Sequence, residues 1–480
     1  MLYSLLAATD NPPRVGQAFL PVHPAELREL TDKNVCPTMP SILIKDGTLL
    51  TMDSQDSVVR GSLMIRDGRI ASIGDSGAAA DVVIDAAGCA VLPGFVQTHI
   101  HLCQTLFRGS ADDLLLLDWL KKRVWPMEAA HTAASIRASA RLGIAELIKG
   151  GTTCALTMET VSHTEEVFKV VDETGFRAIV GKCMMDRGEG VPSQLHEETE
   201  SSIQESLELL EKWNGKADGR IGYCFAPRFA LSCTGELLSR VAKLARERDV
   251  MIHTHASENK NECAIVERET GKGNVAYLDS LGISGAHVML AHCVHLSDDE
   301  LTTLASSKTN VAHCPSSNLK LGSGIAPIAT MLDRGISVSL GADGAACNNR
   351  LDMFTEMRTM ALLQKAMHGP DVLPAGLALR LATWGGAKAR GLEDQIGSLE
   401  VGKRADVIVI NLDSLHSTPH ERNLASAIVY SAQTTDVKSV VIDGKVVMND
   451  GKLLTLDEKS VIREAEHEGV ALINRANIPN

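Results

Sequence analysis

The chain has 480 residues, more than one ordinary domain needs, and 44% of them are hydrophobic but only 3% are aromatic. Its formal net charge of −13 argues against a nucleic-acid partner, because phosphate binding requires a basic face. Eleven scattered cysteines without a CxxC pair favour free thiols in a reducing cytoplasm. No apolar run reaches the roughly 20 residues of a membrane span, so we expect no membrane partner.

The first 38 residues are expected to be a poorly ordered N-terminal extension. Their apolar stretch is broken by Asp10 and no basic segment precedes it, so they make a poor secretion signal.

Short segments near both chain ends have the alternating pattern of β-hairpins. They span residues 41–53, 62–74 and 81–92, and then 405–411 and 437–448, with Asp67-Gly68 and Asp443-Gly444 as turns. We therefore predict one small β-sandwich domain made from both ends, residues 39–92 and 397–454, followed by a C-terminal helix over 455–480.

The long middle part alternates strand and helix patterns. Amphipathic helices are expected over 135–149, 164–174, 200–213 and 234–247. Eight such units predict an α/β fold, a (β/α)8 TIM-type barrel over residues 93–396. A doubly wound sheet is the alternative, but the Gly-rich phosphate turn that usually follows its first strand is missing. The eight strands are expected at 91–101, 152–158, 177–185, 221–227, 250–255, 287–292, 310–314 and 336–343.

Histidines and an aspartate stand at the C-terminal ends of these strands, where a barrel builds its active site. His99 and His101 share one face of the first strand, because side chains alternate along a strand. With His255 and Asp343 they would suit one divalent ion, Zn²⁺ or alternatively Fe²⁺, completed by water. Strand four ends without the lysine that often bridges two metals, which favours a mononuclear site.

Catalytic roles follow from the neighbours of this cluster. A bound metal would lower the pKa of its water, and Glu258, three residues past His255, is placed to accept the proton. His292 would orient the hydroxide and stabilise developing charge. We count Asp343 among the catalytic residues as well as among the ligands.

Several longer segments resemble the amidohydrolase superfamily: PGFVQTHIHLCQTLFRG, DWLKKRVWPMEAA, HTHASE, AHCVHLSDDE, HCPSSNLKLGSGIAPI and LGADGAACNNRLDMF. The similar branch contains methylthioadenosine/S-adenosylhomocysteine, 5′-deoxyadenosine and guanine deaminases and the triazine hydrolases. This resemblance covers about Ser41 to Leu454 and implies the same metal and catalytic residues.

The resemblance also suggests substrate-binding residues. Trp119 and Glu128 match positions that flank the substrate in adenosine-type deaminases, where the glutamate holds ribose hydroxyls. Pro227-Arg228-Phe229 departs from the Pro-His of methylthioadenosine deaminases and resembles guanine and 5′-deoxyadenosine deaminases, so Arg228 should face an acceptor on a purine. The alternatives are a packing tryptophan, an exposed helix glutamate and a salt bridge that closes the barrel mouth.

The function predicted is hydrolytic deamination of a 6-aminopurine nucleoside, which is 5′-deoxyadenosine, methylthioadenosine, S-adenosylhomocysteine or adenosine, to its 6-oxo product and ammonia. The alternatives are a guanine, 8-oxoguanine or pterin deaminase and an s-triazine chlorohydrolase or aminohydrolase. A non-enzymatic scaffold is disfavoured because every expected ligand is present. We expect a cytoplasmic homo-oligomer that binds a small heterocycle or nucleoside, since dimers and tetramers are common in the family.

Overall fold

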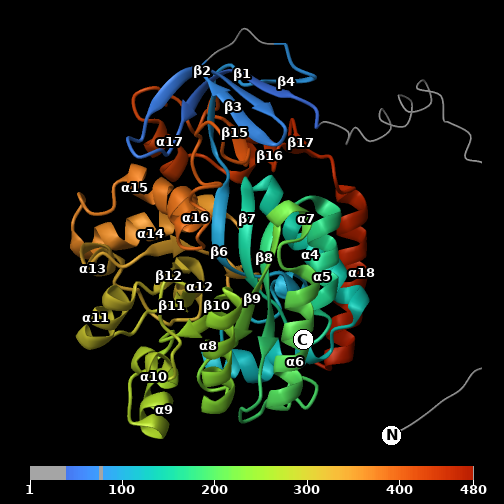
Figure 1. Cartoon of the computed structure of the whole chain (residues 1–480), viewed down its shortest axis with the longest axis vertical. Coiled ribbons are helices and arrows are strands. Elements are labelled where there is room, and N and C mark those ends of the chain that lie inside the picture. Colours follow the sequence, from blue (N-terminus) through green and yellow to red (C-terminus); the bar gives the residue numbers. More distant parts are fainter. Residues whose placement is uncertain (1–38, 75–78, 479–480) are drawn as a thin grey trace, which may run out of the picture. The chain divides into compact units, whose positions relative to one another are not determined.

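The computed structural model describes residues 39–74 and 79–478 of the chain (Figure 1). The predicted N-terminal extension, residues 1–38, lies outside the described residues. Within the described ranges, no helix is long and apolar enough to span a membrane.

A closed parallel barrel holds the middle of the chain. The strands follow one another in chain order around it, and the last one pairs with the first through Asp343 and Ile100. β13 and β14 are separated by only two residues, so they are two halves of the eighth barrel strand. The predicted (β/α)8 barrel is therefore confirmed. Its strands are β6 (Phe95–His101), β7 (Thr152–Met158), β8 (Arg177–Met184), β9 (Ile221–Pro227), β10 (Met251–Ala256), β11 (Val288–His292), β12 (Asn310–His313), β13 (Val338–Leu340) and β14 (Asp343–Gly344).

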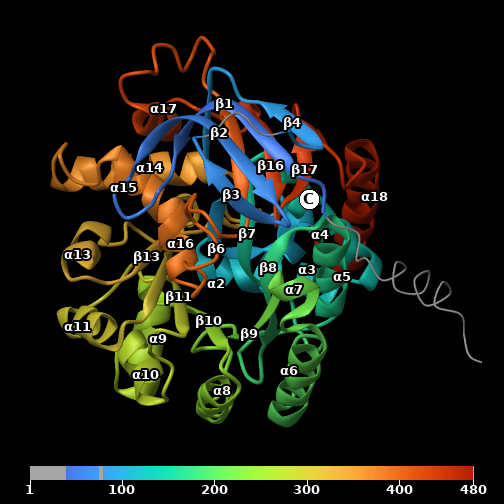
Figure 2. The same ribbon diagram turned by 45° about the horizontal axis from the view of Figure 1, so that its top comes forward.

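Helices surround the outside of the barrel (Figure 2). The strands are apolar and buried on both faces, as parallel strands covered by helices require. Side-chain caps fix where several helices begin: the Ser297 hydroxyl accepts from the backbone of Glu300, and Thr234 caps α8 in the same way. The larger helices are α4 (Ala133–Lys149), α5 (Thr164–Thr174), α6 (Thr199–Trp213), α8 (Gly235–Arg248), α9 (Lys260–Thr270), α10 (Asn274–Ser280), α11 (Asp298–Ser307), α14 (Met353–His368) and α18 (Glu458–Ala476).

Shorter helical segments connect these elements and shape the barrel mouth. They are η2 (Leu102–Phe107), α2 (Leu116–Trp119), η3 (Leu120–Val124), α3 (Trp125–Ala129), α7 (Lys216–Gly219), α12 (Pro315–Lys320), α13 (Ile328–Asp333), α15 (Ala375–Arg380), η4 (Leu381–Gly385), α16 (Gly386–Lys388), α17 (Leu424–Tyr430) and η5 (Thr434–Asp436).

The single strand predicted at 91–101 is two strands that belong to different sheets, which corrects that prediction. β5 (Cys89–Pro93) pairs with the C-terminal part of the chain, whereas β6 begins the barrel. Gly94 joins them at a point where a Cβ atom would lie 2.1 Å from the side chain of Thr153. A continuous apolar run hides such a crossing, because both strands are buried.

Both chain ends build one further sheet, as predicted. β5 pairs with β15, so the N- and C-terminal segments are joined directly. The hydrogen-bonded ladder is one continuous mixed sheet that encloses its own apolar core, which includes Ile44, Leu63 and Val409. Its described strands are β1 (Ile42–Leu50), β2 (Val58–Arg66), β3 (Arg69–Ile73), β4 (Val82–Asp85), β5, β15 (Val407–Asn411), β16 (Val437–Ile442), β17 (Lys445–Asn449) and β18 (Lys452–Leu453).

The domain boundaries stay a prediction. Sheet and barrel belong to one unit from Pro40 onward and are not separated into two.

Candidate active site

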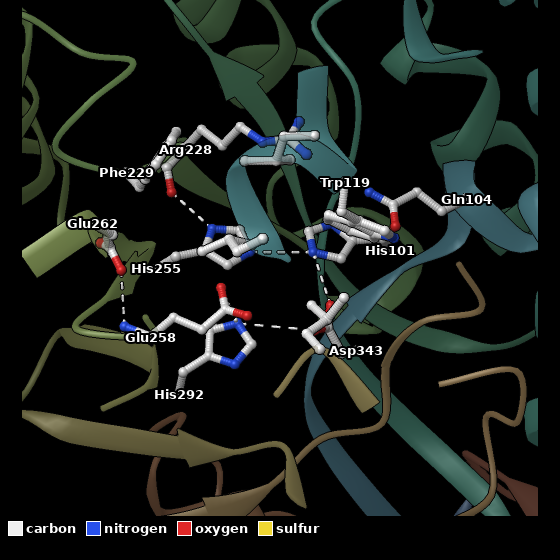
Figure 3. A pocket seen from close by; sticks show the side chains of 13 residues that line it. His101, Gln104, Trp119, Arg228, Phe229, His255, Glu258, Glu262, His292 and Asp343 are labelled. Atoms are coloured by element: carbon white, nitrogen blue, oxygen red, sulfur yellow. Dashed lines mark hydrogen bonds and ion pairs between the residues drawn. The ribbon is translucent and has the colours of Figure 1, made fainter. Parts of the chain in front are cut away.

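A pocket opens at the C-terminal ends of the barrel strands and encloses about 410 Å³ including its mouth. Figure 3 shows imidazoles and carboxylates that face one another in the pocket, with Arg228, Phe229, Trp119 and Gln104 beside them. Its lining residues are His101, Gln104, Leu116, Trp119, Leu120, Arg228, Phe229, His255, Glu258, Glu262, His292, Leu321 and Asp343.

Three imidazoles and one carboxylate meet at the base of this pocket. The Nε2 atoms of His99 and His101 lie 3.3 Å and 3.2 Å from Oδ1 of Asp343. The Nε2 atom of His255 lies 3.3 Å from that of His101. The ligand atoms of His99, His101 and His255 all lie within 4.8 Å of one another, and so do those of His99, His292 and Asp343. The structure thus brings together all four residues that the sequence suggested as metal ligands.

Hydrogen bonds set the tautomers of two of these rings. Nδ1 of His101 lies 2.7 Å from the carbonyl oxygen of Met158, and Nδ1 of His255 lies 2.7 Å from that of Arg228. A carbonyl oxygen can only accept, so each ring donates from Nδ1, and in its neutral form presents a bare lone pair at Nε2. Two lone pairs that face each other at 3.3 Å cannot hydrogen-bond.

The third ring presents a further unpartnered nitrogen. Nε2 of His99 is buried without a hydrogen-bond partner among the described residues, while its Nδ1 lies 2.8 Å from Nε2 of His253. Burial lowers the pKa of His99 to about 4 and that of His255 well below its usual range, so both rings are neutral. Converging neutral imidazoles with oriented Nδ1 atoms fit a divalent cation.

Asp343 supplies the negative charge of this cluster. Burial alone would raise the pKa of this carboxyl, but His99 and His101 hold it well below its usual range. Its other oxygen, Oδ2, accepts a 2.7 Å hydrogen bond from the hydroxyl of Ser317. The backbone at Asp343 has a φ of 64°, which is uncommon for a residue other than glycine. Gly341 precedes this bend where a Cβ atom would lie 2.6 Å from the carbonyl oxygen of His99.

Glu258 and His292 form a second pair beside the cluster. Nε2 of His292 lies 3.6 Å from Oε2 of Glu258 and 3.8 Å from Oδ2 of Asp343. Burial raises the pKa of Glu258 to about 7. Burial would lower the pKa of His292, but the carboxylates of Glu258 and Asp343 outweigh it and raise that pKa. Both pKa values are therefore raised, and Glu258 can hold or release a proton near neutral pH.

Arg228 and Glu128 are bound to each other in the structure. Nη1 of Arg228 lies 2.6 Å from Oε2 of Glu128, and Nη2 lies 3.3 Å from Oε1. The amide of Gln104 also donates to Oε1, at 2.9 Å. Arg228 and Trp119 line the pocket, whereas Glu128 is not among its lining residues. The geometry thus matches the alternative of a salt bridge at the barrel mouth, and contacts of these three residues with a substrate stay a prediction.

Comparisons with known proteins place this site in a family. The model of the amidohydrolase family matches residues 90–447. The chain belongs to the amidohydrolase family. It is therefore a hydrolase that acts on carbon–nitrogen bonds.

Three similar proteins have deaminase names. The 5′-deoxyadenosine deaminase of Methanosarcina mazei is 40% identical over 92% of this chain and 100% of its own length. The 5-methylthioadenosine/S-adenosylhomocysteine deaminase of Desulforudis audaxviator is 40% identical over 90% of this chain and 99% of its own. An adenosine deaminase structure from Xanthomonas campestris with bound zinc matches with a TM-score of 0.85 and 31% identity, over 90% of this chain and 98% of that one.

Sequence reasoning missed several residues that line the amidohydrolase pocket. Gln104 lies three residues past His101 in η2, and Phe229 directly follows Arg228, so both could have been found by proximity. Glu262 lies four residues after Glu258, in the first turn of α9, and its side chain accepts the backbone N–H of Glu258 at 2.9 Å. The apolar wall, made of Leu116, Leu120 and Leu321, carries no sequence signal of its own.

Proposed function

We propose that this amidohydrolase is a deaminase that replaces the 6-amino group of an adenosine-type nucleoside by oxygen and releases ammonia. The candidate substrates are 5′-deoxyadenosine, methylthioadenosine, S-adenosylhomocysteine and adenosine. The observation that carries the proposal is the Glu258–His292 pair, 3.6 Å apart beside the histidine cluster. The names of the similar proteins support the same chemistry and suggest the purine nucleoside.

One divalent cation would be held by His99, His101, His255 and Asp343. The bare Nε2 atoms and the ionised carboxylate support this assignment. Zn²⁺ suits nitrogen and oxygen ligands in this number, and Fe²⁺ is the alternative. When bound, such an ion lowers the pKa of a coordinated water and makes it a nucleophile near neutral pH.

The protein's own groups handle the protons of the reaction. Glu258 takes a proton from the attacking water and passes it to the adjacent ring nitrogen, while the water oxygen forms a bond to the amine-bearing carbon. His292 orients the attacking water and stabilises the charge that develops on its oxygen. Asp343 accepts the remaining proton and delivers it to the amino group. The carbon–nitrogen bond then breaks as the carbon–oxygen double bond forms. Ammonia leaves with one of the two water protons, and the other stays on the ring nitrogen.

Substrate binding is assigned to Trp119, Glu128 and Arg228. The apolar wall suits a planar heterocycle, and Trp119 offers an indole N–H without a partner among the described residues. Glu128 can hold a ribose diol only if its contacts with Arg228 and Gln104 rearrange, because both of its oxygens are occupied.

Because Arg228 and Gln104 already bind both oxygens of Glu128, a second candidate function is favoured, a deaminase of a free base such as guanine, 8-oxoguanine or a pterin. In this reading Arg228 contacts the base and Glu128 only neutralises Arg228. The s-triazines remain a third substrate class to test.

A substrate panel decides between these functions. Metal-replete protein is incubated with 5′-modified adenosines, adenosine, guanine, 8-oxoguanine, pterins and s-triazines, and the release of ammonia or chloride is measured. Turnover of a 6-aminopurine nucleoside that Glu258→Gln abolishes supports the proposal. Turnover of the bases, pterins or triazines without any nucleoside would refute it.

We further infer that the enzyme works in the cytoplasm as a homo-oligomer on small molecules. The ten cysteines within the described ranges are all free thiols, which suits a reducing compartment.

A further inference from the structure

One short segment, residues 317–323, contacts each of the groups assigned to proton handling. It contains the C-terminal half of α12 and the turn that follows. Ser317, at its start, donates to Asp343, Asn318 bonds to His292, and Ser323, at its end, donates to Glu258. Leu321, between the latter two, lines the pocket. Because this segment contacts Asp343, His292 and Glu258, it can fix the positions of these three side chains relative to one another.

Asn318 determines which nitrogen of His292 faces the reaction. Its Oδ1 lies 2.8 Å from Nδ1 of His292, and both side chains are buried. With the oxygen as acceptor, the ring carries its fixed proton on Nδ1. Nε2 is then the nitrogen that faces Glu258 and Asp343 and that can gain or lose a proton.

Ser323 contacts Glu258, the other member of the pair. Its hydroxyl lies 3.4 Å from Oε1 of Glu258, a long contact of the kind that tightens when a substrate binds. Its backbone N–H donates to the carbonyl of Asn318 at 2.8 Å, and its own carbonyl accepts from His295 at 2.7 Å. The flanking Gly322 and Gly324 have φ values of 63° and 129°, so the turn depends on glycine.

We propose that Asn318 and Ser323 are positioning residues that hold His292 and Glu258 in their reactive geometry. They act as one unit, because the backbone carbonyl of Asn318 closes the turn that carries Ser323. The proposal rests on the proposed function, in which Glu258 and His292 move the protons. Neither residue contacts the four assigned metal ligands through a described hydrogen bond, so both should affect kcat and leave metal binding unchanged.

The test compares Asn318→Leu, Asn318→Asp and Ser323→Ala with the wild type. Leucine keeps the size of asparagine without its polar atoms, whereas aspartate keeps the acceptor. Leu319→Ala is the matched control, because Leu319 lies in the same segment and is 43% exposed. For each variant we would measure kcat, KM, metal content and the thermal midpoint, on whichever compound of the panel the wild type turns over.

We expect Asn318→Leu to lower kcat by about 10- to 100-fold, the range that a misplaced catalytic group produces. KM and metal content should stay within about twofold, Asn318→Asp should recover most of the loss, and Ser323→Ala should lower kcat by about 3- to 10-fold. Unchanged kcat in Asn318→Leu, a loss that follows metal loss, or no recovery by aspartate would each overturn the proposal.

A second readout does not depend on turnover. In zinc-loaded protein with ¹⁵N-labelled histidine, the Nδ1–H signal of His292 should be present in the wild type and in Asn318→Asp and altered in Asn318→Leu. An identical signal in all three would refute the role of Asn318. Because the substrate panel is run first on the wild type alone, failure of the nucleoside proposal is separable from failure of this one.

Discussion

The Arg228–Glu128 ion pair predicts that Glu128→Gln destabilises the protein strongly. The two side chains are only 4% and 1% exposed, and their closest atoms are 2.6 Å apart. Burial would lower the pKa of Arg228, but Glu128 outweighs it and raises that pKa. Because an arginine side chain is not deprotonated in proteins, the guanidinium also stays charged when Glu128 is replaced. Removing the carboxylate charge therefore leaves an uncompensated cation inside the barrel mouth.

The size of this effect follows from the geometry. Unit charges 2.6 Å apart attract by about 6 kcal/mol at an effective dielectric constant of about 20. Desolvation of both groups offsets part of this attraction, and breaking one side of a buried pair typically costs about 3–5 kcal/mol. We expect Glu128→Gln to lower the free energy of unfolding by this amount, with Gln104 losing part of its hydrogen bond as well.

The assay is a double-mutant cycle by chemical denaturation of the metal-loaded protein. Arg228→Met should also destabilise, because it leaves the charge of Glu128 unpaired, whereas Glu128→Gln combined with Arg228→Met should recover much of the loss. If the free energy of unfolding of Glu128→Gln lies within about 0.5 kcal/mol of the wild-type value, the ion pair is not buried as the structure shows it, and the reasoning fails.

The ion pair also affects how the activity of Glu128 variants must be interpreted. A loss of kcat/KM in Glu128→Gln alone cannot be assigned to a ribose contact, because the displaced charge of Arg228 disturbs the same pocket wall. The comparison that separates the two is Arg228→Met against the double variant. If Glu128 binds ribose, the double variant should be the poorer nucleoside deaminase although it is the more stable protein.

Three further predictions concern Glu258, the bound cation and the buried Glu356. Glu258→Gln should lower kcat by about 10²- to 10⁴-fold at unchanged metal content. Wild-type kcat/KM should fall as the pH drops below the pKa of Glu258, which is about 7 without metal and which a bound cation lowers. A flat pH profile of kcat/KM between pH 5 and pH 8 would contradict this. Chelation should abolish turnover and lower the unfolding free energy by about 4 kcal/mol at a thousandfold excess of metal over Kd, with recovery on adding Zn²⁺. Burial raises the pKa of Glu356 from 4.5 to about 7, so between these pH values the native state keeps a proton that the unfolded state loses. The free energy of unfolding should therefore fall by up to about 3 kcal/mol as the pH rises through this window. In Glu356→Gln, denaturation curves should show a smaller dependence of this free energy on pH, and an equally steep dependence would refute the assignment.

The barrel and the cluster at its base could be predicted because both depend on short-range regularities. Strand periodicity fixes which side chains share a face, and all parallel strands end at the same rim, so His99, His101 and Asp343 had to lie close together once the fold was known. The roles proposed for these residues did not require any knowledge of how the surrounding loops pack.

The remainder of the site depends on contacts that no local pattern specifies. Arg228 and Glu128 are 100 residues apart in sequence, and each alone resembles a substrate contact. Only the packing of α3 over the barrel mouth shows that they satisfy one another. Asn318 likewise stands in a helix of six residues, and nothing in the sequence indicates that its oxygen reaches His292.

Burial has opposite consequences for the two kinds of group in this pocket, and this difference lets one cavity do two tasks. It lowers the pKa of His99 and His255, which keeps their lone pairs free for a cation. It raises the pKa of Glu258 to about 7 in the absence of a cation, which favours the proposed role of that carboxyl in accepting and returning a proton. A more solvated cavity would lose both properties together, because the histidines would charge more easily and Glu258 would stay ionised. Substitutions that open the apolar wall, such as Leu321→Ser, should therefore weaken metal binding and lower kcat in parallel, although Leu321 bonds to no catalytic atom.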